Sequence, residues 1–357
     1  MFDLVSVIDL PPFSMAQPDK DSLFGEALGD LTRHHYSGCG EYRRILDALG
    51  FDPSLAHTTR EYPYLPVRLF KDFELMSVPS ADIVKTLTSS GTSGQAVSKI
   101  YLDRAAAVTQ TKVLSKIVSD FIGPQRLPML VIDSTTTVKD RQHFSARGAG
   151  IIGFSMFGRD VTYALDDDMA LDMAAIEAFA EKHKGGPVLL FGFTSIVFLH
   201  LIEALAEKGL KLPFEQGILI HGGGWKKLAD IAVDNEAFKA RLADITGIER
   251  VHNYYGMVEQ TGSIFMECGA GRLHSSIFSD IVIRGNDFSE CGQGEKGLVE
   301  LVSLLPSSYP GHVLITEDIG EWLGVDDCPC GRLGKTFAIH GRARQAEVRG
   351  CSDTFTS

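Results

Sequence analysis

The chain has 357 residues, of which 44% are hydrophobic and 22% charged, and its formal net charge is −12. The acidic balance argues against a general surface for nucleic acid or anionic membranes, and no apolar run is long enough to cross a bilayer. Because the N-terminus also lacks the basic flank and apolar stretch of a signal peptide, we expect a globular cytoplasmic protein.

The first 80 residues are expected to be helical and loop-rich, since prolines interrupt them repeatedly. Asp103 is placed to cap a helix that runs to about Asp120. Apolar runs then alternate with helical patterns, which predicts a parallel sheet in an α/β domain. The expected strands are 128–133, 187–191 and 217–221, and the expected helices are 168–183, 194–208 and 225–242.

The pattern changes near residue 262. Short alternating segments at 297–302 and 312–316 lie between Gly and Pro turns, which favours an antiparallel β subdomain. We therefore divide the chain into a helical N-terminal region (1–80), an α/β core (81–261) and a β subdomain (262–357).

Three motifs carry residue types suited to a nucleotide. The loop Ser89-Ser90-Gly91-Thr92-Ser93-Gly94 offers hydroxyls and close backbone approach to phosphate oxygens, although it is not a P-loop. Gly222-Gly223-Gly224 follows a predicted strand and leaves a bare backbone for a flat ligand. Tyr255-Gly256 ends another strand, and Glu259 follows with a carboxylate suited to Mg²⁺. Each motif by itself is explained as well by a turn or a strand end.

The order of the motifs changes this interpretation. The Ser/Gly loop, the Gly-Gly-Gly turn, Tyr255-Gly256-x-x-Glu259, Thr316-Glu-Asp318 and Gly341-Arg342 follow one another as in adenylate-forming enzymes. From about residue 60 onward the chain resembles that superfamily, in the branch that holds phenylacetate–CoA ligases and the acyl-protein synthetase of bacterial bioluminescence. The resemblance is closest to the acyl-protein synthetase, through the segments Ser145-Ala-Arg-Gly-Ala-Gly150 and Arg349-Gly350-Cys351-Ser352-Asp353.

The resemblance implies a role for each motif. The Ser89–Gly94 loop would bind the ATP phosphates, and Gly222–Gly224 would line the adenine and acyl pocket. Tyr255, beside Gly256, would stack on adenine, and Glu259 would bind Mg²⁺. Asp318 would accept hydrogen bonds from the ribose hydroxyls, and Arg342 would approach the ribose or a phosphate.

Two departures from the family pattern accompany these roles. Val258 stands where the family usually has Thr, which removes one hydroxyl from the nucleotide site. The chain also ends where full-length superfamily members continue into a mobile domain, whose lysine contacts the reacting groups. We therefore expect an α/β large domain and a β subdomain without that mobile domain.

The resemblance also implies a reaction: ATP-dependent activation of a carboxylic acid, a long-chain fatty acid, to acyl-AMP. The acyl group would then pass to Cys351 as a thioester, because a thiolate attacks an acyl-adenylate readily, and from there to an acyl reductase or another acceptor protein. Two alternatives stay open: a ligase that delivers the acyl group to CoA or a carrier protein, and an idle nucleotide-binding scaffold subunit.

The cysteines suggest a second site. Six cysteines are too few for a disulfide scaffold in a chain of this length. Cys268, His274, Cys328 and Cys330 make a complete tetrahedral set for a structural Zn²⁺ ion, with no open position for catalysis. Free thiols packed in the core explain the same residues without a metal.

Overall fold

The computed structural model describes residue 2 and residues 4–89, 97–139, 146–225 and 232–343. This part of the chain forms two compact units. Among the described residues, unit 1 combines three segments: the one that ends at Ser89, the following one that ends at Phe121, and the one that begins at Gly256. Unit 2 is built from Ile122–Tyr255. Unit 1 therefore unites segments from both ends of the chain, and the linear division into 1–80, 81–261 and 262–357 stays a prediction.

Helices dominate the N-terminal part of unit 1, as expected from the sequence. The longest begins with Pro18 in its first turn, where the missing N–H costs no helical hydrogen bond. Asp103 Oδ1 accepts a hydrogen bond from Ala106 N at 2.8 Å, so the predicted cap is confirmed. The helices are α1 (Leu4–Ile8), α2 (Gln17–Gly38), α3 (Gly40–Ala48), α4 (Leu69–Asp72), the 3₁₀ helix η1 (Ser80–Asp82) and α5 (Arg104–Ile122).

The sheet of unit 1 is antiparallel, with strand order β11-β12-β13-β14-β10-β9, and β1 (Leu65–Pro66) is added to β13 in parallel. This sheet confirms the predicted β subdomain. Two further strands, β2 (Ile83–Thr88) and β3 (Lys99–Asp103), form an antiparallel pair. The other strands are β9 (Phe265–Glu267), β10 (Leu273–His274), β11 (Ser279–Arg284), β12 (Lys296–Ser303), β13 (Val313–Val325) and β14 (Lys335–Arg342).

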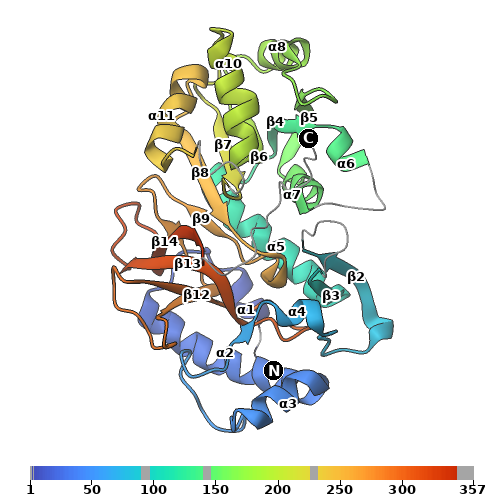
Figure 1. The fold of residues 1–357 in the computed structure, drawn as a ribbon, viewed down its shortest axis with the longest axis vertical. Helices are drawn as coiled ribbons and strands as arrows, with labels where there is room; N and C mark the ends of the chain where they lie inside the picture. The colour runs from blue at the N-terminus through green and yellow to red at the C-terminus, as the bar shows by residue number, and fades with distance from the viewer. Residues whose placement is uncertain (1, 3, 90–96, 140–145, 226–231, 344–357) are drawn as a thin grey trace. The chain divides into compact units, whose positions relative to one another are not determined.

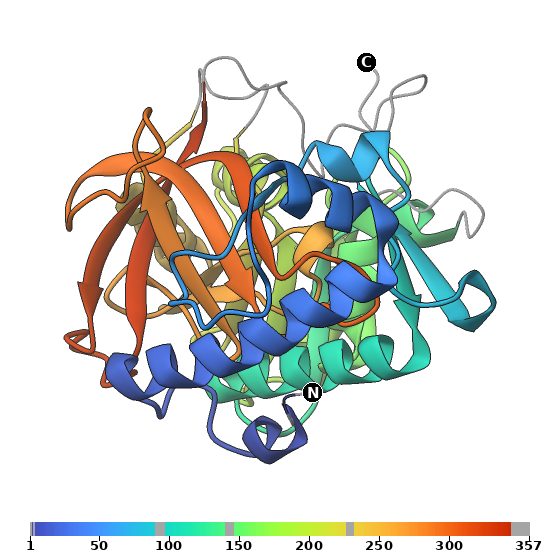
Figure 2. The same ribbon diagram turned by 90° about the horizontal axis from the view of Figure 1, so that it is seen from below.

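Apolar clusters join the helices of unit 1 to its sheet. Phe24 and Leu28 of α2, drawn in blue in Figure 2, pack with Val302 of β12 and Val313 of β13. Each fully buried side chain of this kind stabilises the fold by about 1.5–3 kcal/mol. A second cluster has as members Cys39, Tyr42, Leu46, Leu65, Phe70, Leu75, Ile100, Leu102, Ala106, Tyr309 and Leu314.

Buried charges add to the contact between α2 and the sheet. Lys20 Nζ lies 3.6 Å from Asp280 Oδ1, and Lys335 Nζ lies 3.1 Å from Asp280 Oδ2. Burial lowers the pKa of Lys20 to about 8, although the Asp280 carboxylate opposes the shift. Because an unpaired charge in this position would be costly, the three residues hold one another in place.

Unit 2 contains the predicted parallel sheet, with strand order β8-β7-β6-β4-β5. The central strands are apolar and buried, as expected for a sheet covered on both faces. Every strand predicted in this region is confirmed. The strands are β4 (Leu127–Ser134), β5 (Gly158–Leu165), β6 (Leu189–Phe193), β7 (Ile218–Gly222) and β8 (Arg250–Tyr255).

Helices pack against the parallel strands of unit 2 (Figure 1). Residues 226–231 of the helix expected over 225–242 lie outside the described residues; the described helix begins at Asn235, where Asp234 Oδ1 caps it by accepting from Ala237 N at 2.7 Å. The helices are α6 (Thr136–Lys139), α7 (Ala146–Ser155), α8 (Met173–Lys182), α9 (Thr194–Ile196), the π-helix η2 (Val197–Glu203), α10 (Ala204–Glu207) and α11 (Asn235–Thr246). Among the described residues, no helix combines the length and hydropathy needed to cross a membrane.

Two buried histidines stack between α2 and the start of β13. The ring centroids of His35 and His312 are 4.8 Å apart. His35 Nδ1 lies 2.7 Å from Ser77 Oγ, and His312 Nε2 lies 3.0 Å from Thr32 Oγ1. Burial lowers the pKa of His312 to about 3 and holds the pKa of His35 well below its usual range, with the neighbouring histidines adding to the effect.

These shifts predict acid sensitivity. Both imidazoles are neutral in the folded state and have a pKa of about 6.5 when unfolded, so the stability they contribute is present above pH 6.5 and is lost as the pH falls below it. We expect the thermal midpoint to be lower at pH 5 than at pH 7.5. The variant His312→Gln should show a smaller change of the midpoint over this range. Scanning calorimetry across this range measures both. The surface variant His340→Gln is the control, and an equal effect of the two variants would contradict the assignment.

Candidate functional site

Glu259 lies in unit 1, on the short 3₁₀ helix η4 (Val258–Gln260), and its side chain is buried. Burial raises the pKa of the carboxyl group, while the Ser98 side chain and the positive charges of Lys71 and Arg342 oppose the shift. A buried carboxylate of this kind gains from a bound cation. The residue therefore fits the hard oxygen ligand that Mg²⁺ requires.

Asp318 and Arg342 face each other on neighbouring strands of the same unit. They are paired in the register of β13 and β14, and Arg342 Nε lies 3.6 Å from Asp318 Oδ1. Arg342 Nη1 also lies 3.9 Å from Glu317 Oε2. Since the charge of Arg342 acts on the Glu259 carboxyl group, three residues far apart in sequence share one neighbourhood.

The base of the Ser/Gly loop belongs to the β2–β3 pair. Ser89 N donates to Ser98 O at 3.1 Å, and Ser98 N donates to Ser89 Oγ at 2.9 Å. These two hydrogen bonds fix the point at which the loop leaves the strands. Ser90, Gly91, Thr92, Ser93 and Gly94 lie outside the described residues.

The Gly-Gly-Gly turn lies in unit 2, at the carboxyl end of β7. A Cβ atom on Gly222 would overlap the ring of Tyr254. Gly223 has a φ of +76°, which favours glycine, whereas a Cβ on Gly224 would meet open space. The turn is fixed by Thr194 Oγ1, which lies 2.8 Å from Gly223 O.

Tyr254 is an aromatic residue whose packing the sequence did not indicate. Its ring lies 4.8 Å from that of Phe154 and covers Gly222. Tyr255, which was predicted to stack on adenine, is the last residue of β8, and its side chain must leave the sheet on the opposite face from Tyr254. Gly256 follows it as the first residue of the C-terminal part of unit 1. The nucleotide role of Tyr255 stays a prediction.

A buried ion pair at the carboxyl end of β4 was also missed. Arg147 of α7 donates from Nε to Asp133 Oδ2 at 2.6 Å and from Nη2 to Asp133 Oδ1. Thr137 Oγ1 donates to the same carboxylate at 2.6 Å. The pair fixes the start of α7, within the segment that carries the resemblance to acyl-protein synthetases.

The predicted metal ligands come together in unit 1. The ligand atoms of Cys268, His274, Cys328 and Cys330 all lie within 4.8 Å of one another. Cys268 Sγ is 3.7 Å from Cys328 Sγ, and Cys330 Sγ is 3.4 Å from His274 Nε2. A tetrahedral Zn²⁺ ion with Zn–S bonds of about 2.3 Å would separate two sulfur ligands by about 3.8 Å, so the cluster has suitable dimensions.

Protonation in this cluster follows from burial. Burial raises the pKa of the Cys328 thiol to about 12 and lowers that of His274 to about 4. The imidazole is therefore neutral, as a metal ligand must be. The thiol would ionise only beside a cation.

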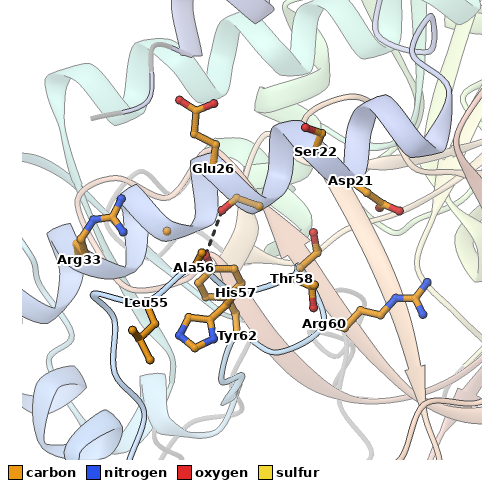
Figure 3. A pocket seen from close by; sticks show the side chains of 13 residues that line it. Asp21, Ser22, Glu26, Arg33, Leu55, Ala56, His57, Thr58, Arg60 and Tyr62 are labelled. Atoms are coloured by element: carbon orange, nitrogen blue, oxygen red, sulfur yellow. Dashed lines mark hydrogen bonds between the residues drawn. The ribbon is translucent and has the colours of Figure 1, made fainter.

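A cavity of about 730 Å³ lies between α2 and residues 55–62 of unit 1 (Figure 3). Among the residues that line the cavity, the Tyr62 hydroxyl donates a hydrogen bond to Gly25 O at 3.1 Å. Arg33 and Arg60, at its rim, are already paired with Asp30 and Glu290. None of its lining residues belongs to the predicted nucleotide or metal sites.

Comparison with known proteins gives a consistent result. The family model described as "Acyl-protein synthetase, LuxE" matches residues 2–357. A long-chain-fatty-acid–luciferin-component ligase of Aliivibrio fischeri is 25% identical over 330 residues, covering 89% of this chain and 84% of the relative. The ligase of the same name from Vibrio harveyi is 22% identical over 334 residues, covering 90% and 84%.

Solved structures with the same fold include a 2-hydroxyisobutyryl-CoA ligase. Its open conformation, with 2-HIB-AMP and CoA, has a TM-score of 0.69 at 16% identity, covering 92% of this chain and 76% of that one. Its postadenylation state, with R3-HIB-AMP, has a TM-score of 0.71 at 17% identity, covering 92% and 69%. The predicted fold class, that of adenylate-forming enzymes, is confirmed by this likeness.

The packing of the Gly-Gly-Gly turn generates a test. Gly222→Ala should lower the free energy of unfolding by about 1–3 kcal/mol, because the new methyl group overlaps the Tyr254 ring. Gly224→Ala should change it little, because its Cβ would meet open space. Urea unfolding of the two variants measures the difference, and equal stabilities would show that Gly222 is not packed as described.

Proposed function

Because the chain belongs to the acyl-protein synthetase family LuxE, we propose that it joins a carboxylic acid to a protein thiol in two steps, the first of which consumes ATP. In the first step, the carboxylate attacks the α-phosphate of ATP and releases pyrophosphate, giving acyl-AMP. In the second step, a cysteine thiolate attacks the acyl carbon and releases AMP, giving a thioester. The names of the curated relatives support a long-chain fatty acid as the substrate.

The observation that carries this proposal is the shared neighbourhood of Glu259, Asp318 and Arg342 in unit 1. We assign Asp318 to the ribose hydroxyls, because a carboxylate accepts from two hydroxyl donors. We assign Arg342 to the ribose or a phosphate, where a guanidinium neutralises negative charge. Magnesium held by Glu259 would neutralise phosphate charge as the pyrophosphate departs.

The remaining motifs have proposed roles of their own. We assign Ser89, Ser90, Gly91, Thr92, Ser93 and Gly94 to the phosphates. We assign Gly222, Gly223, Gly224, Tyr255 and Gly256 to the adenine and acyl groups. These residues act by positioning the reactants and stabilising developing charge. ATP as the substrate is compatible with the cytoplasmic location expected from the sequence.

The acyl acceptor in this proposal is Cys351, which lies outside the described residues. From this thiol the acyl group would pass to a partner protein such as an acyl reductase. The alternative acceptors are CoA and a carrier-protein thiol, and the solved ligase with the same fold binds CoA. A third possibility is an idle nucleotide-binding scaffold, which would activate no acid.

Two assays on one variant separate these candidates. Cys351→Ser should keep acid-dependent ATP–pyrophosphate exchange and lose radiolabelled acyl protein, because a hydroxyl without a base is a far poorer nucleophile than a thiolate. Glu259→Gln should lose both and is the control. Acyl label retained by Cys351→Ser would place the acceptor elsewhere, and no exchange by the unaltered protein with any fatty, aryl or amino acid would reject the enzyme.

We also propose that Cys268, His274, Cys328 and Cys330 hold one structural zinc ion. Support comes from the spacing of their ligand atoms and from the burial of the cluster. The ion would join β9, β10 and the turn after β13, where thiolates left without a cation would be costly.

Zinc binding has its own test. Elemental analysis of tag-free protein should find about one zinc per chain. Cys328→Ser should lose the metal and lower the thermal midpoint by several degrees, because metal binding is coupled to folding. Cys39→Ser is the matched control, since Cys39 is an equally buried thiol outside the cluster. If metal-free protein had full stability, the zinc site would be rejected and the four residues would be ordinary core side chains.

A further inference from the structure

The loop between β12 and β13, residues 304–312, contacts the backbone of the turn that carries Glu259. The loop is itself fixed to unit 1: Ser308 Oγ donates to Tyr101 O at 2.8 Å, and Ser308 O accepts from Ser77 N at 2.8 Å. A fixed support therefore lies directly behind η4.

Tyr309 makes the first contact. Its hydroxyl donates to the main-chain oxygen of Glu259 at 2.9 Å. The side chain is fully buried. Its ring packs edge-on against the ring of Phe70, with the two ring centroids 6.1 Å apart. Burial raises the pKa of the Tyr309 hydroxyl above its usual value, so the group stays protonated and remains a donor.

Gln260 makes the second contact, in which the turn donates the hydrogen bond and the loop accepts it. Its Nε2 donates to Gly311 O at 2.8 Å and to Leu301 O at 3.2 Å. The side chain is 1% exposed, and no group among the described residues hydrogen-bonds to its Oε1. Gln260 is therefore tied to both the loop and β12 through its amide nitrogen.

Gly311 allows the two segments to approach this closely. A Cβ atom at this position would overlap the Tyr309 ring and come within 2.9 Å of Glu259 O. Three residues after Glu259, a Cβ on Gly262 would lie 2.7 Å from Gln110 O. Glycine therefore stands at two close approaches around the Glu259 turn.

We propose that Tyr309 and Gln260 are positioning residues, which hold the main chain of Glu259 so that its carboxylate is preorganised for the magnesium–nucleotide complex. The inference rests on the proposed function. Its physical basis is that a metal-ligating carboxylate works only within a narrow range of positions, so that groups fixing its main chain tune its affinity.

The chain offers a matched control for the test. Tyr42 belongs to the same apolar cluster as Tyr309, is equally buried, and also has its hydroxyl in a buried contact, 3.3 Å from His312 Nε2. Among the described residues the Tyr42 hydroxyl makes no hydrogen bond to η4, so Tyr42→Phe removes a buried hydroxyl without removing a hydrogen bond to Glu259. Tyr309→Phe and Tyr42→Phe should therefore cost similar stability.

The experiment measures the magnesium dependence of the two variants. Acid-dependent ATP–pyrophosphate exchange is titrated with Mg²⁺, and ATP binding is measured by calorimetry with Mg²⁺ and with EDTA. Tyr309→Phe should raise the half-saturating Mg²⁺ concentration about fivefold, as expected for one lost hydrogen bond, and weaken binding of Mg·ATP but not of metal-free ATP. Tyr42→Phe should leave both unchanged.

A second variant guards against a folding failure. Gln260→Met keeps the size of the side chain, removes the tie to Gly311 and also removes the buried Oε1. It should shift the magnesium dependence in the same direction, with circular dichroism confirming the fold.

The outcomes separate the inference from the proposed function. Equal magnesium dependence in Tyr309→Phe, Gln260→Met and Tyr42→Phe would overturn the positioning role while leaving acid activation intact. Unfolding of both site variants, with Tyr42→Phe folded, would make the contact purely structural. Absence of exchange and of magnesium-dependent ATP binding in the unaltered protein would overturn the proposed function, and the positioning role with it.

Discussion

The packing of α2 on β12 and β13 is the contact on which unit 1 depends. It buries Phe24 and Leu28 against Val302 and Val313, so that residues about 280 positions apart share one core. The same sheet carries Asp318 and Arg342, and the loop that contacts Glu259 connects two of its strands. The apolar contact between helix and sheet therefore fixes the sheet that carries Asp318, Arg342 and the loop in contact with Glu259.

Electrostatics refines this packing without replacing it. Asp280 pairs with both Lys20 and Lys335, and each of the three is buried. Such groups contribute little net stability, yet the loss of one would leave an uncompensated charge. Another register of α2 on the sheet would separate Lys20 from its carboxylate.

Local patterns explain how much could be predicted from the sequence. Apolar runs predict β4, β6 and β7 because strands buried on both faces must be apolar along their whole length, and Asp103 predicts the start of α5 because capping is a local interaction. The set of cysteines and one histidine was also found from residue types, and the structure brings its ligand atoms together. The roles of the site residues stay proposals.

Contacts between distant segments explain what was missed. Tyr309 follows Glu259 by 50 residues, and no local pattern links a tyrosine in a loop to a main-chain oxygen so far away. The packing of Tyr254 on Gly222 depends on which face of β8 each residue occupies, and two successive tyrosines are indistinguishable until the register with β7 is known.

The division of unit 1 between both ends of the chain has a consequence for biosynthesis. As the polypeptide leaves the ribosome, α2 emerges with its apolar stripe, but the strands that cover this stripe are synthesised more than 250 residues later. At about 5–20 residues per second the nascent helix stays uncovered for tens of seconds, whereas Ile122–Tyr255 is continuous and is complete before β12 is made. The apolar stripe of α2 therefore stays exposed through most of synthesis, and a chain that ends before residue 296 lacks the strands that cover it.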